Sequence, residues 1–393
     1  MKKYFFLLSW ILCISNSFSQ YLDLSQQAEI SVLTIGPGSS LNDSFGHSAF
    51  RVKDRTKNLD IIFNYGVYDF EAENFYLKFA RGKLNYIVDV SNYEAFKNYY
   101  IRQNRWIKEQ VLDLSNDNKQ KVFDFLANNS EPENKFYLYD FFFDNCATKM
   151  KDVLTDGVGL VIDFENPKDF EAKTFRELIQ KNLNWNSWGS LGIDIALGSV
   201  IDKTALPEEH MFLPEYIYHF FENATIADSN DKPLVRLTKD VFVNQDKAQE
   251  KQFFLSPIIV LGILSVIILF FTIQDYKKGT RSKTLDIILF FISGAAGIIL
   301  LLLWLATDHS ATAQNYNLLW AFAVNLFVLG QVYKNEPKNW FIRYLKFLLI
   351  MLCLLLLQWV VGMQRFAFAL MPFLIALAVR YTFLIYHFNQ QKS

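Results

Sequence analysis

Hydrophobic residues are distributed unevenly along this 393-residue chain. Before about residue 250, apolar residues come in short runs that alternate with polar and charged ones. Runs rich in β-branched and aromatic residues predict strands, and runs with helical spacing predict helices. The strand candidates are 30–35, 49–53, 60–65 and 234–243, and the helix candidates are 93–106 and 117–128. This mixture predicts one α+β domain.

After residue 250 the apolar runs become long enough to cross a bilayer, which takes about 20 helical residues. Five such runs predict five transmembrane helices, of which the third is short and less uniformly apolar. They lie at about 253–274, 285–306, 317–333, 344–361 and 367–386. A polar, charged segment, 244–251, predicts a linker before them. The chain is therefore divided into a domain over 20–250 and a membrane domain over 251–393.

The first residues have the pattern of a secretory signal peptide. Two lysines precede an apolar stretch, 4–14, and small serines lead from it to Gln20. An uncleaved anchor is the less favoured alternative, because the apolar stretch is short for a transmembrane span. We predict a signal peptide over 1–19 with cleavage near Ser19.

The charges of the predicted loops set the orientation of the spans. The first and third connections carry clusters of Lys and Arg, whereas the second, 307–316, has none and the fourth has only Arg365. Positive residues collect on the cytoplasmic side of a membrane, so the first and third loops are cytoplasmic. The domain before the first span is then outside, as the signal peptide also requires. Both features predict a multi-pass protein of the inner membrane with a periplasmic N-terminal domain.

Composition narrows the classes of function. The formal net charge is −1, from 39 Lys and Arg against 40 Asp and Glu, so no basic surplus indicates a nucleic-acid partner. The sequence has no His-x-x-x-His pattern and no paired-cysteine ligand set, so we predict no metal site and no cofactor. The aromatic content of 17% is typical of core and lipid-facing packing.

One cysteine is predicted to remain in the exported domain. Of the three in the chain, Cys13 leaves with the signal peptide and Cys353 lies within a predicted span, which leaves Cys146. A lone thiol in an oxidising compartment has no partner there for an internal disulfide. Cys146 is therefore either a buried, inert residue or a reactive one.

The neighbours of Cys146 favour the reactive alternative. It follows an aromatic run, 136–143, and precedes a stretch, 147–154, that predicts a helix. Asp144 or Asn145 can cap this helix and place Cys146 in its first turn. The unpaired N–H groups and the helix dipole there favour a thiolate, and the same donors can stabilise an oxyanion beside the sulfur.

A thiolate nucleophile needs a base, and the predicted periplasmic domain contains three histidines. His47 follows Gly46 at the head of a predicted strand, after a turn rich in Ser, Asn and Asp, and such loop edges often carry sites. A surface or capping histidine is the alternative. We interpret His210 and His219, which lie in helix-like or aromatic surroundings, as structural.

A catalytic base also needs a polar partner that orients it. Asn64 lies on the strand predicted to pair beside the His47 strand, and we choose it over Asp60 and Asp69. An equally plain interpretation is that Asn64 forms a turn before Gly66. Asn64 is therefore the third member of the candidate catalytic set.

The order of these motifs resembles a known group of enzymes. A histidine on a strand, followed about 100 residues later by Asn-Cys at a helix start, resembles the circularly permuted papain-like acyltransferases and hydrolases, among them the lecithin:retinol acyltransferase group. The whole chain resembles more closely the Lnb-type lipoprotein N-acyltransferases of Bacteroidetes, which join an exported cysteine domain to a helical membrane domain. The matching segments are FGHSAFRV around His47, FNYGVYDF at 63–70, YLYDFFFDNCATKMKD at 137–152 and MFLP at 211–214.

The resemblance implies a fold and a reaction. The fold is an α+β permuted papain-like cysteine domain followed by an all-α five-helix transmembrane domain. Cys146 would take an acyl chain from a membrane phospholipid as a thioester, and the α-amine of a diacylglyceryl-cysteine lipoprotein would accept it as an amide. His47 would deprotonate the thiol and later the amine, which titrates at about pH 8.

Three further features keep more than one interpretation. The apolar, glycine-containing segment 185–214 is a membrane-facing platform, an acyl groove or packed core. The polar loop 308–315 faces the active site or a lipid headgroup, or it is a solvated connector. Arg380 lies in the last span, where we expect it to extend toward the cytoplasmic surface, and we assign it no role.

Two other functions compete with acyl transfer. A membrane-anchored cysteine peptidase or amidase acting on cell-wall peptides would use the same residues but gives no reason for five spans. A non-enzymatic membrane sensor or assembly factor predicts that Cys146→Ala leaves function intact. The membrane half favours the acyltransferase, because both of its substrates are lipids anchored in a bilayer.

Overall fold

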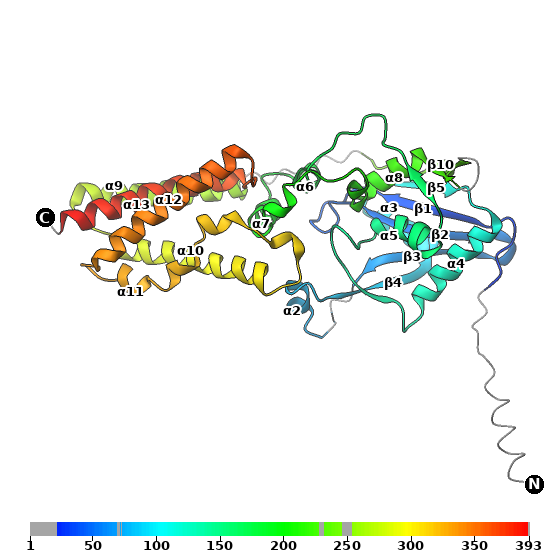
Figure 1. Ribbon diagram of the computed structural model, residues 1–393, viewed down its shortest axis with the longest axis horizontal. Helices are drawn as coiled ribbons and strands as arrows, with labels where there is room; N and C mark the ends of the chain where they lie inside the picture. Colours follow the sequence, from blue (N-terminus) through cyan, green and yellow to red (C-terminus); the bar gives the residue numbers. More distant parts are fainter. Residues whose placement is uncertain (1–21, 69–70, 72, 228–231, 246–253, 392–393) are drawn as a thin grey trace, which may run out of the picture.

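The computed structural model describes residues 22–68, 71, 73–227, 232–245 and 254–391. Its N-terminal part combines sheets and helices, and its C-terminal part is a bundle of long helices. The two parts lie end to end (Figure 1). The predicted signal peptide, 1–19, lies outside the described residues, as does most of the predicted linker.

A seven-stranded antiparallel sheet forms the centre of the N-terminal part, in the order β10-β5-β1-β2-β3-β4-β6. Its strands are β1 (Glu29–Ile35), β2 (His47–Asp54), β3 (Leu59–Val67), β4 (Asn85–Asn92), β5 (Ile107–Leu112), β6 (Phe136–Leu138) and β10 (Val235–Phe242). The four predicted strands are therefore confirmed as β1, β2, β3 and β10. A small second sheet contains β7 (Ile162–Phe164), β8 (Ala224–Ile226) and β9 (Lys232–Pro233).

Two layers of helices cover the two faces of the large sheet. The longer helices of this part are α2 (Phe75–Ala80), α3 (Tyr93–Arg102), α4 (Asn116–Ser130), α5 (Thr148–Asp152), α6 (Phe175–Lys181), α7 (Trp188–Ala196) and α8 (Pro214–Asn223). Successive strand residues point to opposite faces, so Leu33 and Ala49 pack against α3, whereas Val32 and Phe50 pack against α4, α5 and α8. The predicted helix 117–128 is confirmed as α4, and the predicted helix 93–106 forms as α3 but ends four residues early, at Arg102.

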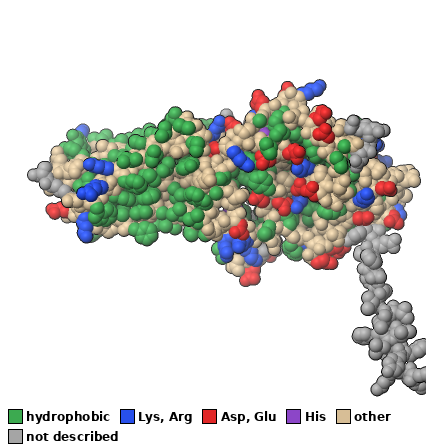
Figure 2. All heavy atoms as spheres, viewed as in Figure 1, with side chains coloured by type: hydrophobic (Ala, Val, Ile, Leu, Met, Phe, Trp, Pro, Cys, Tyr) green, Lys and Arg blue, Asp and Glu red, His purple; other side chains and the backbone are tan. Residues whose placement is uncertain are grey.

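Among the described residues of the C-terminal part, four helices are long and apolar enough to cross a bilayer. They are α9 (Pro257–Lys278), α10 (Lys283–Leu305), α12 (Asn339–Val361) and α13 (Met371–Gln390). Figure 2 shows apolar side chains over most of this bundle, with charged ones on the N-terminal part and at the far end of the helices. These helices agree with the first, second, fourth and fifth predicted spans.

The third predicted transmembrane helix, over 317–333, does not form as one helix. The segment contains two short 3-10 helices, Tyr316–Leu319 and Ala323–Leu326, and one helical turn, α11 (Leu329–Val332). In Figure 1 it follows a broken path between the end of α10 and the start of α12. The structure therefore has an irregular segment in place of the third predicted helix.

Close packing and side-chain hydrogen bonds explain this irregular path. Non-helical backbone at membrane depth is tolerated where protein buries it. Gly297 of α10 has no side chain, and a Cβ there would lie 2.2 Å from the carbonyl oxygen of Ala321. The buried Asn325 donates to the Ser293 hydroxyl and accepts from the Tyr344 hydroxyl. Hydropathy detects the apolar composition of this segment but not these contacts between elements.

Arg380 of α13 is fully buried inside the helical bundle. Its guanidinium lies 2.7 Å from Asp275 of α9 and 2.7 Å from Asp286 of α10. Arg281 contacts Asp286 as well, at 3.4 Å. Arg380 does lie toward the cytoplasmic ends of the helices, since Asp275 and Asp286 flank the first loop, but its side chain is buried against them and does not reach the surface.

Hydrogen bonds join the two parts of the chain. The amide of Asn317 donates to the carbonyl oxygen of Asp194 in α7 at 3.0 Å, and the N–H of Gly198 donates to the carbonyl oxygen of Ala311 at 2.9 Å. The segment that contains α7 is therefore a platform that contacts the membrane part. The loop 308–315 is held against the N-terminal part and is not a solvated connector.

Candidate active site

Cys146 lies in a tight turn directly before α5. The buried Asn145 shapes this turn, because its side-chain oxygen accepts the N–H groups of Ala147 at 2.7 Å and Thr148 at 3.0 Å. Its amide donates to two backbone carbonyl oxygens. Asn145 is thus the residue that closes the start of the helix, while Asp144, the alternative cap, pairs with a lysine. Cys146 stands just ahead of the helix, which begins at Thr148 and not at 147.

His47 is the first residue of β2, and the glycine before it allows the backbone to pass close to the end of β1. Gly46 has φ +81°, and a Cβ there would lie 2.7 Å from the carbonyl oxygen of Ile35. In β3, Asn64 Oδ1 lies 2.6 Å from His47 Nε2. Because an amide oxygen only accepts hydrogen bonds, Nε2 is the protonated nitrogen and donates to Asn64. This leaves Nδ1 to serve as the base.

The thiol of Cys146 lies close enough to the imidazole of His47 for each group to shift the pKa of the other. The structure therefore brings together Cys146, His47 and Asn64, which come from a turn and two strands. All three residues are partly buried. A cysteine, a base and an amide that orients the base are the parts that covalent acyl transfer requires.

The surroundings favour a thiolate paired with an imidazolium. Burial by itself raises the pKa of the Cys146 thiol. Attraction and hydrogen bonding to His47 lower this pKa, and so do the backbone N–H groups of Ser48 and Cys146. The net result is a pKa below the ordinary value of a cysteine. Burial lowers the pKa of His47, but Cys146 and the hydrogen bond to Asn64 raise it above its ordinary value. Both directions stabilise the same charge-separated pair.

Gly66 leaves room beside the sulfur. It lies at a break in the register between β3 and β4, with φ +89°, as expected of a β-bulge. A Cβ at Gly66 would lie 3.5 Å from the Cβ of Cys146. A side chain at this position would both strain the backbone and occupy space next to the nucleophile.

Tyrosines that sequence reasoning did not single out surround the pair. The ring of Tyr100 in α3 stacks on His47 with centroids 6.1 Å apart. Burial raises the pKa of the Tyr137 and Tyr139 hydroxyls, and negative charge on Cys146 raises it further, so both phenols stay neutral. Their sequence signal is weak, because they are three among 19 tyrosines.

A buried arginine holds the loop that leads into His47. Arg105 donates to the carbonyl oxygen of Gly36 at 2.7 Å and to Asp43 at 3.0 Å, and its guanidinium lies 4.8 Å from the centroid of the Tyr100 ring. It spans the loop between β1 and β2 and rests on the ring that stacks on His47. Sequence reasoning missed this positioning residue, since no local pattern links 105 to 36–43.

The other candidate residues lie in different surroundings. Both ring nitrogens of His210 contact backbone groups, and burial lowers its pKa, as its structural interpretation predicts. His219 is exposed on α8. Asp60 pairs with Arg51 at 2.7 Å. Asp69 lies outside the described residues, so Asn64 is the candidate that the structure places on His47.

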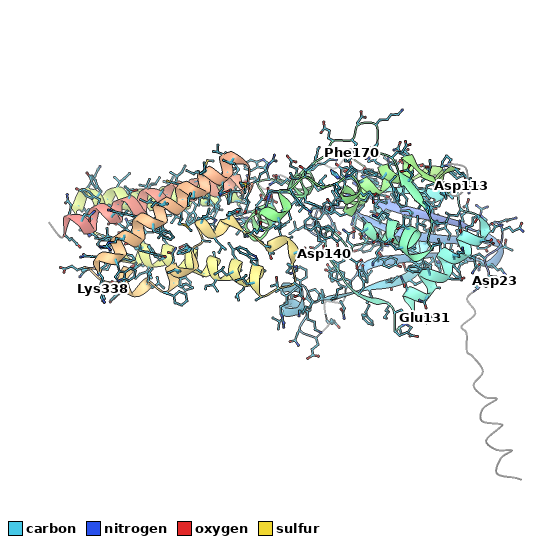
Figure 3. All side chains as sticks on the ribbon, in the orientation of Figure 1. Asp23, Asp113, Glu131, Asp140, Phe170 and Lys338 are labelled. Atoms are coloured by element: carbon cyan, nitrogen blue, oxygen red, sulfur yellow. The ribbon has the colours of Figure 1, made fainter. Side chains whose placement is uncertain are left out.

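The site faces the membrane part of the chain. Figure 3 labels Asp140, which lies at the end of the N-terminal part nearest the helical bundle. The backbone of Asp140 pairs with that of Asp144, two residues before Cys146. The turn that carries the nucleophile therefore lies toward the membrane part of the chain.

Comparison with protein families gives two matches. The Lnb N-terminal periplasmic domain matches residues 17–181, which include all three site residues, and the Lnb transmembrane domain matches residues 248–392. No curated protein and no solved structure matches the chain. Together the two domains account for the exported α/β part and the apolar helices that follow it. The chain is an Lnb-type protein of the inner membrane, with a periplasmic N-terminal domain and a C-terminal multi-pass membrane domain.

Proposed function

We propose that this protein is a lipoprotein N-acyltransferase that moves an acyl chain from a phospholipid, through a Cys146 thioester, to the α-amine of a diacylglyceryl-cysteine lipoprotein. The observation that carries the proposal is the grouping of Cys146 with His47, itself hydrogen-bonded to Asn64, at the membrane-facing end of an Lnb periplasmic domain. The chemistry of the series supports acyl transfer, and the family supports lipoprotein processing.

The first half-reaction forms the thioester. The Cys146 thiolate attacks an ester carbonyl carbon of the phospholipid, and negative charge develops on the carbonyl oxygen. The N–H groups of Ser48 and Cys146, which lower the pKa of the thiol, are candidate donors to this charge. The C–O bond then breaks, the lysophospholipid oxygen takes the proton from His47, and the acyl chain stays on sulfur.

The second half-reaction forms the amide. The lipoprotein amine attacks the thioester carbonyl carbon, and neutral His47 takes a proton from the nitrogen. The C–S bond breaks and Cys146 leaves as a thiolate, which restores the starting pair. Asn64 holds the imidazole in one orientation through both steps, so the same nitrogen, Nδ1, exchanges each proton.

We also propose that the periplasmic domain is a permuted papain-like fold. The support is the chain order His47, Asn64 and Cys146, with the base on one strand, its partner on the adjacent strand and the nucleophile at a helix start.

The irregular segment 316–333 would be a fifth membrane crossing beside the four long helices. It ends near the first loop, because Arg281 at the end of that loop donates to the carbonyl oxygen of Val332.

Membrane anchoring supports lipid substrates. Extracting a lipid chain from a bilayer costs about 0.8 kcal/mol per methylene, or roughly 11 kcal/mol for 14 methylenes. A site attached to membrane helices avoids this cost, because donor and acceptor stay in the leaflet while only the reacting groups move. A cell-wall peptidase would have no such requirement.

The test is the intact mass of lipoprotein N-termini from cells that carry the wild-type protein or its Cys146→Ser variant. We expect a third acyl chain with the wild type and diacylated lipoproteins with the variant. Triacylated lipoproteins in the Cys146→Ser cells would overturn the assignment of the nucleophile. Release of lysophospholipid without lipoprotein acylation would indicate a lipase, and cleaved muropeptides would indicate the peptidase.

A further inference from the structure

The short helix α2 exposes apolar side chains at the junction between the two parts of the chain. Tyr76, Leu77 and Phe79 are 79%, 58% and 53% exposed, and the helix is only six residues long. Burial in protein cannot explain these side chains, since Phe75 alone points into the fold. A contiguous exposed apolar face of this kind marks an interaction site.

The position of α2 relative to α10 identifies what covers this face. The N–H of Asp308 donates to the carbonyl oxygen of Arg81 at 3.0 Å, and His309 contacts the carbonyl oxygen of Phe79 at 3.0 Å. Asp308 is three residues after the end of α10 at Leu305, so α2 ends within about 10 Å of the last turn of a transmembrane helix. Figure 1 shows α2 beside that end of α10.

The end of α10 that lies beside α2 also exposes apolar side chains. Leu302 and Leu305, in the last turn of α10, are both largely exposed, as expected of lipid-facing residues. Near the start of α9, Trp185 and Trp188 are also exposed, and Trp188 donates to the carbonyl oxygen of Leu255 just before that helix. Tryptophans at this level are typical of the membrane–water interface.

Basic residues accompany the apolar ones on and after α2. Lys78 and Arg81 are exposed, and Lys83 forms a half-exposed pair with Asp308 at 3.5 Å. In Figure 2, basic and acidic side chains gather where α2 projects from the junction. Apolar side chains with lysine and arginine beside them are the pattern of a helix that lies in the interface of an anionic leaflet.

A row of aromatic rings leads from α2 to the nucleophile. The ring centroids of Phe75 and Tyr68 lie 5.9 Å apart, those of Tyr68 and Tyr86 lie 5.3 Å apart, and Tyr86 stacks on Tyr139 at 4.2 Å. Tyr139 and Cys146 both border the space above Gly66. The row therefore connects the exposed helix with the site.

We propose that α2 inserts into the outer leaflet of the inner membrane and that the aromatic row guides an acyl chain from this point to Cys146. The second half of the proposal rests on the proposed acyltransferase function, whereas the insertion of α2 does not. The occupant of the α2 surface is the lipid leaflet, and the occupant of the row is one chain of a leaflet lipid.

Insertion is tested by fluorescence quenching in the full-length protein. The native cysteines are replaced by serine, an introduced cysteine carries an environment-sensitive fluorophore, and the protein is placed in nanodiscs of phosphatidylethanolamine and phosphatidylglycerol with brominated acyl chains. We expect the Tyr76→Cys label to be quenched about twofold or more, as at a depth of about 5–10 Å. The matched control is Leu237→Cys, an exposed apolar position on the edge strand β10, which we expect to remain unquenched. Equal quenching at both positions, or none at Tyr76→Cys, would refute the insertion.

The route is tested by the double variant Leu77→Asp/Phe79→Asp. We expect about tenfold slower thioester formation from bilayer phospholipid, with unchanged alkylation of Cys146 by iodoacetamide, a small soluble reagent. An unchanged rate of thioester formation from phospholipid would overturn the route. An equal loss in thioester formation and in alkylation would also overturn it, because it would show damage at the Cys146 site itself. If the wild type forms no thioester with any lipid, the proposed function fails, while the quenching result still decides where α2 lies.

Discussion

Replacing Asn64 by alanine tests how the charged pair is stabilised. The perturbation removes the acceptor 2.6 Å from His47 Nε2 and leaves Cys146 in place. A hydrogen bond to a charged imidazolium contributes about 1.5–3 kcal/mol, and one to a neutral imidazole about 0.5–1.5 kcal/mol. The imidazolium therefore loses about 1–1.5 kcal/mol more than the neutral ring, which disfavours the thiolate–imidazolium pair by about 5- to 10-fold.

The assay is the rate of Cys146 alkylation by iodoacetamide as a function of pH, in a Cys353→Ser background because Cys353 is exposed. We expect Asn64→Ala to react about 5- to 10-fold more slowly below neutral pH, where only the charged pair supplies thiolate. Asn223→Ala, which removes an asparagine that bonds a helix carbonyl oxygen, is the control and should behave as the wild type. Superimposed profiles for Asn64→Ala and wild type would refute the reasoning.

Three further predictions use other contacts. His47→Ala should move the alkylation profile of Cys146 to higher pH, because burial raises the thiol pKa once the imidazole that lowers it is gone; an unmoved profile would contradict the pairing. Gly66→Ala should lower the free energy of unfolding by about 1 kcal/mol, because alanine is strained at φ +89°. It should also slow thioester formation, and a faster reaction would show that the space beside Cys146 is not used. Asp286→Ala should destabilise the helical bundle by about 3–5 kcal/mol in detergent, because the buried charge of Arg380 then has one partner fewer. An unchanged unfolding temperature would show that the charge cluster around Arg380 is dispensable.

Local sequence pattern predicts most of the periplasmic sheet. Short, mostly apolar runs in 30–35 and 49–53 give β1 and β2, since each strand packs both of its faces against helices. The choice of Asn64 over Asp60 needs the register of the strands. Phe50 opposes Phe63, so Asn64 lies near the His47 end of β2, whereas Asp60 lies opposite Lys53. Turn length sets that register and is not visible in hydropathy.

Contacts between distant elements account for what the sequence does not predict. The segment 317–333 is apolar enough for a span, but packing of Gly297 against the Ala321 backbone decides its irregular shape. Arg380 appears unpaired in the sequence because its carboxylate partners lie about 100 residues away on other helices. The helix α2 is too short for any membrane-segment criterion, and only its contact with the end of α10 places it at the leaflet.

The most direct test of the central claim is the mass of the Cys146 peptide from purified full-length protein incubated with phospholipid vesicles. The account predicts one acyl chain on Cys146 that hydroxylamine removes, as expected for a thioester. Adding a diacylated lipopeptide should clear this mass and yield a triacylated product, and Cys146→Ser should give neither. Acylation of the lipopeptide by the Cys146→Ser protein, or an acyl chain on a different residue, would contradict the account.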